Sequence, residues 1–492
     1  MAYFEKITGA EKLKGFVITI LFVVMAVMFG FMTAKKGMMI PIFLVVLPIA
    51  GAYLTILFLN PRIGIKSFLC YCFFVTALSR YVPGVPYGLG MDGLLVLSFL
   101  AIFFGGFRKT DWSPVKNDLC ALALIWFILN ILELGNPYGG SPLGWFYGFR
   151  AAGLYWFLVT IVTFMLLRKK KDLDTFILIF IGISALGTLW GIRQFLFGVD
   201  PMEQRWLDAG AAKTHVLFGK LRVFSFYSDA GQFGASQAHV GLISVLLALG
   251  PFSWTKRIIF GGIGLLILYG MLISGTRGAL FVVFAGVFIY LILTKEIKIL
   301  IIGAIFGGGA FFILKFTSIG SGNAEIVRLR TALDPNDASF QERLKNQNIL
   351  KEYLSSRPFG TGVGTIGTWG VKYNEHKFIS QIPPDSLFVK VWAEYGIVGF
   401  LLWFGIQMYV LGKSSGIIWN IRDPVLKQKL MALTAGSAGI LFASYGNEVQ
   451  NQMPTSAIVY MSWVFVFMAP RWEIEEEVRL EKTKQEEETE EA

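Results

Sequence analysis

The sequence predicts an all-α protein that crosses a membrane many times, with about 12 to 14 transmembrane helices and a large loop on the outward side. Of its 492 residues, 55% are hydrophobic and only 16% are charged, and the mean hydropathy is +0.61. Apolar runs of about 17 to 25 residues recur along most of the chain, and each is long enough to cross a bilayer as a helix. Runs such as Phe99 to Phe104 do not alternate between apolar and polar residues, which excludes a β-barrel.

Composition also argues against a nucleic-acid-binding protein and against a protein built on disulfides or a cysteine-bound metal. The formal net charge is +11, but Lys and Arg accumulate in the cytoplasmic loops of membrane proteins, so the charge follows from topology and indicates no nucleic-acid partner. Cys70, Cys72 and Cys120 all lie inside apolar segments. We therefore expect them to be small buried hydrophobic residues, without a disulfide frame or a metal cluster.

The alternation of basic connections sets the predicted topology. The first apolar run, Phe16 to Thr33, has no small-x-small cleavage site and is expected to be a retained helix. With the basic N-terminus in the cytoplasm, every second connection should be basic, and the short Lys35–Lys36 connection is the exception. The connections that fit contain Arg62 and Lys66; Arg108, Lys109 and Lys116; Arg168 to Lys171; Lys256 and Arg257; Lys295 to Lys298; and Arg422 to Lys429.

This topology divides the chain into four parts. Residues 1–315 form the N-terminal transmembrane helices and include an outward loop at 199–232, and residues 316–385 form a larger outward loop. Residues 386–469 form the C-terminal transmembrane helices, and residues 470–492 form an acidic tail in the cytoplasm. The tail is rich in Glu and has no aromatic residue after Trp472, so we expect a solvated, partly disordered end.

A short helix is predicted within the larger outward loop. Ser339 and Glu342 have the spacing of a capping box, and the helix should stop before Pro358. Phe340, Leu344 and Leu350 are available for an apolar face. We expect this amphipathic helix to lie on the membrane surface.

The segment that follows, Gly360 to Gly367, contains a G-x-G-x-x-G match. No strand precedes it and no βαβ unit surrounds it, so the match does not indicate a nucleotide site. It predicts a flexible, tightly turning loop.

Arginine on the outward side runs against the positive-inside rule, so each such residue near a membrane boundary needs a reason. The candidates are Arg150, Arg193, Arg222, Arg277, Arg328, Arg330, Arg343 and Arg357. The structural alternative is that they reach the interface or pair with outward acids such as Asp208 and Asp229. Arg277 differs because a turn of only about five residues, Ser274 to Gly278, holds its guanidinium at the membrane surface. A guanidinium fork there suits a diphosphate, which Arg can bind through two parallel hydrogen bonds.

Several of these segments together resemble the O-antigen ligase and polymerase superfamily. They are the Ser274–Ala279 turn; Arg222 with the polar run Phe226–Gln232; Arg343 followed by Arg357–Gly364; and Asp385–Gly399. Their order and sidedness agree with the predicted topology. The resemblance implies a GT-C type, all-helical fold in the bacterial inner membrane, with the active site facing the periplasm.

The resemblance also implies an activity: transfer of a glycan from undecaprenyl diphosphate to an acceptor hydroxyl, on lipid A core or on a growing polysaccharide, without a metal or another cofactor. Arg222 and Arg277 would match the family's arginines and stabilise the negative charge that grows on the diphosphate as the glycosidic bond breaks. The outward loops show no His or acidic cluster with metal-ligand spacing. Further substrate contacts are expected from Arg150, Arg343, Arg328 and Arg330.

The chain departs from the family pattern at the expected general base. Members commonly carry His-Asn where this chain has Asp385 and Ser386. Asp385 would take the acceptor proton as a carboxylate, or cap the helix that begins at Ser386, and one residue can do both. His376 is the alternative base, while His215 and His239 are expected to be structural.

Three other classes of membrane protein share some of these features. A polysaccharide transporter or flippase also places Arg in the membrane, but the sequence shows no repeated halves and no matched pair of broken helices. The cell-wall glycan polymerases of the shape and division family share the architecture, yet their loop motifs are not visible. A purely structural scaffold is disfavoured by the density of outward Arg. The sequence leaves open whether the acceptor is lipid A core, a lipid-linked chain or a protein hydroxyl.

Overall fold

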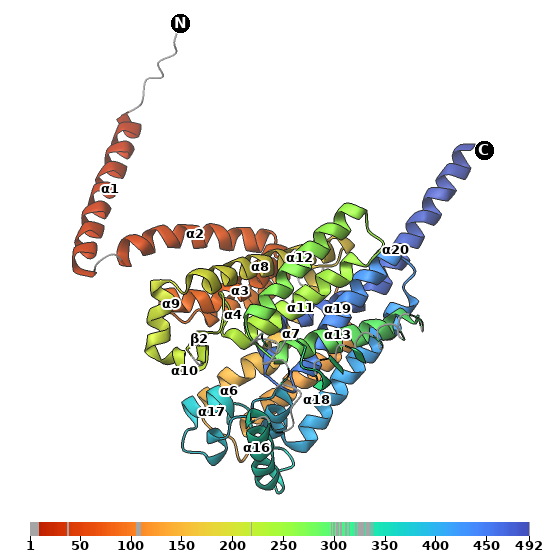
Figure 1. Ribbon diagram of the computed structural model, residues 1–492. Helices are drawn as coiled ribbons and strands as arrows, with labels where there is room; N and C mark the ends of the chain where they lie inside the picture. Colours follow the sequence, from red (N-terminus) through yellow and green to blue (C-terminus); the bar gives the residue numbers. More distant parts are fainter. Residues whose placement is uncertain are drawn as a thin grey trace. The chain divides into compact units, whose positions relative to one another are not determined.

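The computed structural model describes residues 9–36, 39–104, 110–217, 219–296 and 338–491, together with scattered residues between 298 and 336. The described residues are helical almost throughout, and their one sheet is a two-stranded hairpin (Figure 1). Six of the described helical segments are long and apolar enough to cross a membrane: Arg62–Tyr81, Asp118–Gly135, Pro142–Leu166, Lys170–Phe197, Trp254–Ile273 and Leu387–Asn420. The prediction of an all-α, multi-pass membrane protein is confirmed.

The chain divides into two units, residues 1–63 and residues 64–492. The first unit contains α1 (Gly9–Lys36) and α2 (Met39–Leu59), which contact each other. Helix α1 covers the whole of the Phe16 to Thr33 run that was predicted to be a helix.

The second unit contains the remaining elements. Its long helices are α3 (Arg62–Tyr81), α4 (Gly88–Phe104), α5 (Asp118–Leu132), α6 (Pro142–Phe149), α7 (Tyr155–Leu166), α8 (Lys170–Phe197), α11 (Ala230–Ala248), α12 (Trp254–Ile273), α13 (Gly278–Thr294), α18 (Leu387–Asn420), α19 (Pro424–Ala443) and α20 (Thr455–Glu491). The 199–232 loop holds α9 (Pro201–Trp206), η5 (Leu207–Ala211), α10 (Ala212–His215) and the antiparallel strands β1 (Val216–Leu217) and β2 (Lys220–Leu221). The larger loop holds α16 (Ala338–Leu354), α17 (Gly367–Tyr373) and η6 (Phe378–Gln381), and further short turns are η2 (Ser113–Val115), η3 (Glu133–Gly135), η4 (Arg150–Leu154) and η7 (Val449–Asn451).

Helix α11 lies at the centre of the second unit, in contact with α8, α12, α13 and α19 (Figure 1). Because it is buried on nearly every side, its polar side chains need partners inside the bundle. Gln237 accepts a hydrogen bond from Thr188 Oγ1 at 2.9 Å, and Gln232 donates to Thr455 Oγ1 at 2.9 Å. The helix begins at Asp229, whose carboxylate accepts from the Gln232 amide. This capped end lies beside the site described below.

Helix α18 is broken at Gly396, which has φ +67°. A break in a helix frees carbonyls that must find other donors. Those of Ala393 and Glu394 accept from the backbone amides of Thr361 and Gly362, at 3.0 and 2.8 Å. The glycine-rich loop therefore completes the hydrogen bonding of α18 at its break.

The same loop turns through glycines at each step. Gly360, Gly362, Gly364 and Gly367 all have positive φ, which a side chain would disfavour. The tight turns are thus as predicted. The loop was also expected to be flexible, but it is buried, and the Gly364 amide donates to Glu394 Oε1 at 2.8 Å. It is a packed part of the site.

Helix α16 confirms the helix predicted before Pro358, although it begins at Ala338, one residue before the expected cap. Its buried stripe, Asn346, Leu350 and Leu354, faces protein. Leu350 and Leu354 pack in one cluster with Val389 of α18. Leu350 and Leu354 are therefore covered by protein, whereas Phe340 is exposed, and the expected position of the helix on the membrane surface stays a prediction.

The acidic tail is more ordered than predicted. Helix α20 continues through Glu491, and its acidic residues pair with basic connections. Glu473 Oε1 accepts from the Arg422 amide at 2.7 Å, and Glu476 lies 3.2 Å from Lys170 Nζ. These contacts hold the start of the acidic segment against Arg422 and Lys170.

The break in α18 gives a stability prediction. A Cβ on Gly396 would lie 2.0 Å from the Pro358 carbonyl oxygen, and a side chain at positive φ adds about 1–2 kcal/mol of strain. Gly396→Ala should therefore lower the thermal unfolding temperature of the purified protein clearly. Gly405→Ala, in the same helix and with open space around it, is the matched control and should unfold like the wild type. Equal unfolding temperatures for both variants would contradict the role given to the break.

Candidate active site

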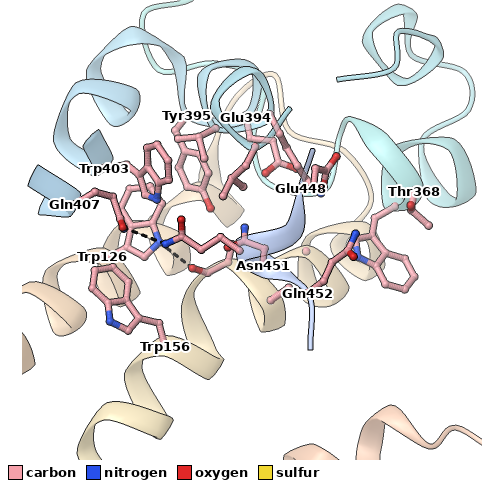
Figure 2. Close-up of a pocket in the computed structure, with 18 of the residues that line it drawn as sticks. Trp126, Trp156, Thr368, Glu394, Tyr395, Trp403, Gln407, Glu448, Asn451 and Gln452 are labelled. Atoms are coloured by element: carbon pink, nitrogen blue, oxygen red, sulfur yellow. Dashed lines mark hydrogen bonds and ion pairs between the residues drawn. The ribbon is translucent and has the colours of Figure 1, made fainter. Parts of the chain in front are cut away.

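A cavity of about 240 Å³ lies along the N-terminal part of α18. Its wall combines side chains from α5, α7, α17, α18, α20 and the 448–452 segment (Figure 2). Figure 2 shows Trp126, Trp156 and Trp403 gathered at one end and Thr368, Glu448 and Gln452 at the other. The cavity thus has an aromatic end and a polar end.

An ion pair marks the polar end. Lys390 Nζ lies 2.6 Å from Glu448 Oε2, and the two side chains are 15% and 22% exposed. Gly367 lies against this pair, since a Cβ there would sit 3.6 Å from Glu448 Oε1. The partial exposure of the pair makes this end the mouth of the cavity.

Glu394 lies one helical turn after Lys390 on the same face of α18, because residues four apart share a face. Its side chain is only 2% exposed, and one carboxylate oxygen accepts from the Gly364 amide at 2.8 Å. A buried carboxylate requires such partners, and the glycine-rich loop supplies one. The next residue, Tyr395, donates to Asn130 Oδ1 at 2.6 Å, which ties this turn of α18 to α5.

The aromatic end contains two amide side chains. Gln450 Nε2 donates to Gln407 Oε1 at 3.0 Å. Gln450 Oε1 and Trp156 Nε1 are buried and have no hydrogen-bond partner. Buried polar atoms without partners are rare in folded proteins, so these two atoms suggest a ligand or water in the cavity.

The segment after α19 connects the cavity mouth to two other parts of the site. Asn447 lies against the start of α11, because a Cβ on Gly231 would meet its Nδ2 atom at 2.9 Å. Arg343 Nη1 lies 3.7 Å from the position of a Cβ on Gly446. Arg343 of α16 therefore reaches this segment, as the substrate-binding prediction requires.

The two arginines of the predicted diphosphate site come together at one turn. Arg222, just after β2, donates from Nη2 to Thr276 Oγ1 at 3.2 Å, and Thr276 Oγ1 donates to the Ala230 carbonyl at 2.8 Å. Arg277 follows Thr276 and occupies the cap position of α13, where it is partly exposed. The turn therefore brings Arg222 and Arg277 to the N-terminal end of α11, next to the segment that carries Glu448.

Arg150 is placed differently from the prediction. Its Nη2 atom lies 2.8 Å from Asp92 Oδ2 and donates to Tyr155 OH at 2.9 Å, and only 8% of the residue is exposed. It does not line the cavity. Asp92 pairs with the Arg150 guanidinium, and Tyr155 accepts a hydrogen bond from it. This is the pairing with an acid that the sequence analysis gave as the alternative to a substrate contact.

Two other predicted residues that the structure describes, Arg330 and His376, do not line the cavity. Both terminal nitrogens of Arg330 donate to backbone carbonyls, those of Thr317 and Ile319. Arg328 lies outside the described residues. His376 is exposed between α17 and η6 and does not line the cavity.

The predicted structural role of His215 fits its surroundings. His215 packs on Trp206 and Phe224, and its Nδ1 atom hydrogen-bonds the Ala211 carbonyl at 2.9 Å. Burial lowers the pKa of His215 below its usual value, which favours the neutral ring.

Asp385 is exposed and has φ +50°. The cap of α18 is Ser386, whose hydroxyl accepts from the Val389 amide at 3.4 Å. The alternative in which Asp385 caps the helix is therefore wrong. The neighbouring Pro384 approaches Gly367, which itself touches the Lys390–Glu448 pair, so Asp385 lies near the mouth of the cavity.

The prediction missed Lys390, Glu394, Glu448 and Gln450. Charged residues in an otherwise apolar helix, such as Lys390 and Glu394, were a usable signal. So was the polar run Asn447–Gln452 between two apolar segments. Nothing in the sequence paired positions 390 and 448.

Comparison with known proteins adds the family. Residues 262–404 match the family model described as O-antigen ligase, a region that includes Arg277, Arg343, Asp385 and Glu394. A search of curated proteins found no match. The family match confirms the resemblance to the O-antigen ligase and polymerase superfamily, and the similarity lies in residues 262–404 of this multi-pass membrane protein.

Proposed function

We propose that the protein is a membrane glycosyltransferase that moves a glycan from undecaprenyl diphosphate to an acceptor hydroxyl. The observation that carries this proposal is that Arg222 donates to Thr276, in the same turn that carries Arg277, at the start of α11. The family match supports the same class of reaction. Arg343, which reaches the same region, is proposed as a further substrate contact.

The proposed chemistry is a single displacement at the sugar's C1 atom. The bond between C1 and the diphosphate oxygen breaks, and the acceptor oxygen forms a new bond to C1 from the opposite face. Negative charge grows on the leaving diphosphate, and fixed guanidinium groups at Arg222 and Arg277 stabilise it without reorganisation. The acceptor proton goes to Asp385, the proposed base, or to His376, the alternative.

Arginine can serve in place of a metal because its planar fork matches two phosphate oxygens. Within the part of the chain that the structure describes, no group of three or more His, Cys, Asp or Glu side chains is placed to hold a metal ion. We propose a reaction without a metal because two guanidinium groups can supply the charge stabilisation, and chelators should leave the rate of transfer unchanged.

We further propose that the protein lies in the bacterial inner membrane with the site facing the periplasm. Alkaline phosphatase, which is active only in the periplasm, should be active when fused after Lys345 and inactive when fused after Lys170, because basic connections stay in the cytoplasm. Enzyme assays on whole cells, normalised to fusion protein level, provide the measurement. An inactive fusion after Lys345 would contradict the outward placement of the site.

Deletion of the gene separates the possible acceptors. Single short repeats on the carrier lipid indicate a polymerase, and full-length chains that remain unattached indicate a ligase. Repeats that stay on the cytoplasmic side would instead indicate a flippase and would overturn the transferase proposal. The measurement is electrophoresis of the lipid-linked and lipopolysaccharide fractions from the parent strain, the deletion strain and the complemented deletion strain.

A further inference from the structure

The aromatic end of the cavity has no part in the proposed chemistry. Arg222, Arg277 and Asp385 do not line the cavity, whereas Trp403 and Gln407 lie at its aromatic end (Figure 2). A cavity lined by aromatic rings with a few convergent polar groups is the usual form of a small-molecule site.

We propose that this end of the cavity binds one uncharged sugar ring of the glycan and disfavours acidic sugars. The proposal rests on the proposed function, because it assigns the site to part of that substrate. It adds a specificity determinant that is separate from the diphosphate contacts.

The walls suit the apolar faces of a sugar. A pyranose presents C–H groups on its two faces and hydroxyls around its edge, so it packs flat on an aromatic ring. Trp126, Trp156, Trp403 and Tyr460 supply such rings around the cavity. Trp156 and Trp403 are themselves buried, so their ring positions are fixed before a ligand arrives.

The unpartnered atoms suit the hydroxyls. Gln450 Oε1 needs a donor and Trp156 Nε1 needs an acceptor, and a hydroxyl group can be either. Gln450 is held by its bond to Gln407, so its free oxygen has a defined direction. A purely apolar ligand such as a lipid chain would leave both atoms unsatisfied, which is costly in a buried site.

The charges disfavour an anion. The cavity is lined by the carboxylates of Glu394 and Glu448 and by one cation, Lys390, which is already paired with Glu448. An acidic sugar or a phosphate would enter with no free cation to neutralise it and would meet the buried Glu394. The diphosphate therefore belongs outside the mouth, at the arginines.

The size restricts the ligand to one ring. A volume of about 240 Å³ is below the roughly 300–1,000 Å³ of sites for drug-sized ligands. The remainder of the glycan must extend through the mouth, past the Lys390–Glu448 pair.

Saturation-transfer NMR on the full chain in lipid nanodiscs tests the proposal. The probes are methyl glucoside, methyl N-acetylglucosaminide and methyl glucuronide, each at millimolar concentration. The two neutral sugars should receive saturation from the protein, and the glucuronide signal should be at least about fivefold weaker. Equal signals from all three probes would overturn the charge argument, and no signal from any probe would indicate a cavity that holds water only.

Two variants place the binding in the cavity. Gln450→Met keeps the side-chain length but removes the amide, and Trp156→Phe keeps an aromatic ring but removes the N–H group. Each should weaken the neutral-sugar signal several-fold, whereas Gln381→Met, at an exposed position on η6, should not. The unfolding temperature and gel filtration report whether each variant is folded. If one of the two variants misfolds, the other still tests the proposal. Wild-type signal in both would overturn the assignment.

The outcome is separable from that of the proposed function. Sugar binding without any glycan transfer by the wild type would leave the cavity assignment standing and remove the transferase proposal. Glycan transfer that depends on Arg277, with no sugar binding in the cavity, would do the reverse.

Discussion

Arg277→Lys is expected to lower the rate of glycan transfer by about 10²–10³-fold while leaving the amount of folded protein unchanged. Lysine keeps the positive charge, but it is a point charge on a flexible chain and cannot reproduce the planar fork. Arg277 occupies the cap position of α13, in the turn that also receives the hydrogen bond from Arg222. The measurement is the initial rate of transfer by the purified protein with a lipid-linked glycan donor.

Arg205→Lys is the matched control. Arg205 is exposed on α9 in the 199–232 loop, and its backbone contact is local, to the Pro201 carbonyl. Its replacement should leave the rate unchanged. Near-normal transfer by Arg277→Ala, with protein levels intact, would show that the Arg277 side chain reaches the membrane interface without a role in transfer.

Arg222→Lys should reduce transfer in the same way, because its Nη2 contact to Thr276 links it to the same turn. The combined variant should cost less than the sum of the two single losses in free energy, since both side chains act on one diphosphate. Fully additive losses would argue for two separate sites.

The fold was largely predictable because membrane helices carry their own signal. An apolar run of about 20 residues has few alternatives in a bilayer, so segments such as Lys170–Phe197 and Trp254–Ile273 were expected from the sequence. The break at Gly396 was not expected from the sequence. A glycine in an apolar segment does not reveal whether it continues the helix or adopts positive φ, as Gly396 does. The conformation of Gly396 depends on contacts with the Gly360–Gly367 loop, which is separated from α18 by α17 and η6 in the sequence.

The site was predictable only in part, for a related reason. Outward arginines break a topological rule, which drew attention to Arg222 and Arg277, but the rule cannot tell a free guanidinium from one paired to an acid. Asp92 lies in α4, and only the packing of α4 on α7 brings it to Arg150. The Lys390–Glu448 pair likewise joins two segments that are far apart in the sequence, and the sequence does not show how these segments are aligned in the fold. Apolar patterning also could not say whether the face of α16 is covered by lipid or by α18.

The second large effect is expected at Asp385. Asp385→Asn should lower transfer by about 10²–10⁴-fold, because it removes the titratable oxygen that would accept the acceptor proton. The substitution is unusually clean at this position. Ser386 provides the helix cap, so the cap does not change, and Asn adopts positive φ nearly as readily as Asp. Stability should therefore match the wild type, which a thermal unfolding measurement checks.

Asp385→His separates a base from a structural residue. Histidine also tolerates positive φ, and it would restore the pattern that family members commonly carry, so partial activity should return. Its ordinary pKa of about 6.5 lies above that of Asp, so the acidic limb of the pH–rate profile should move to higher pH. Normal transfer by Asp385→Asn together with loss in His376→Ala would assign the base to His376. If both variants are normal and Glu448→Gln is inactive, the proton acceptor is the carboxylate at the cavity mouth, and the role proposed for Asp385 is wrong.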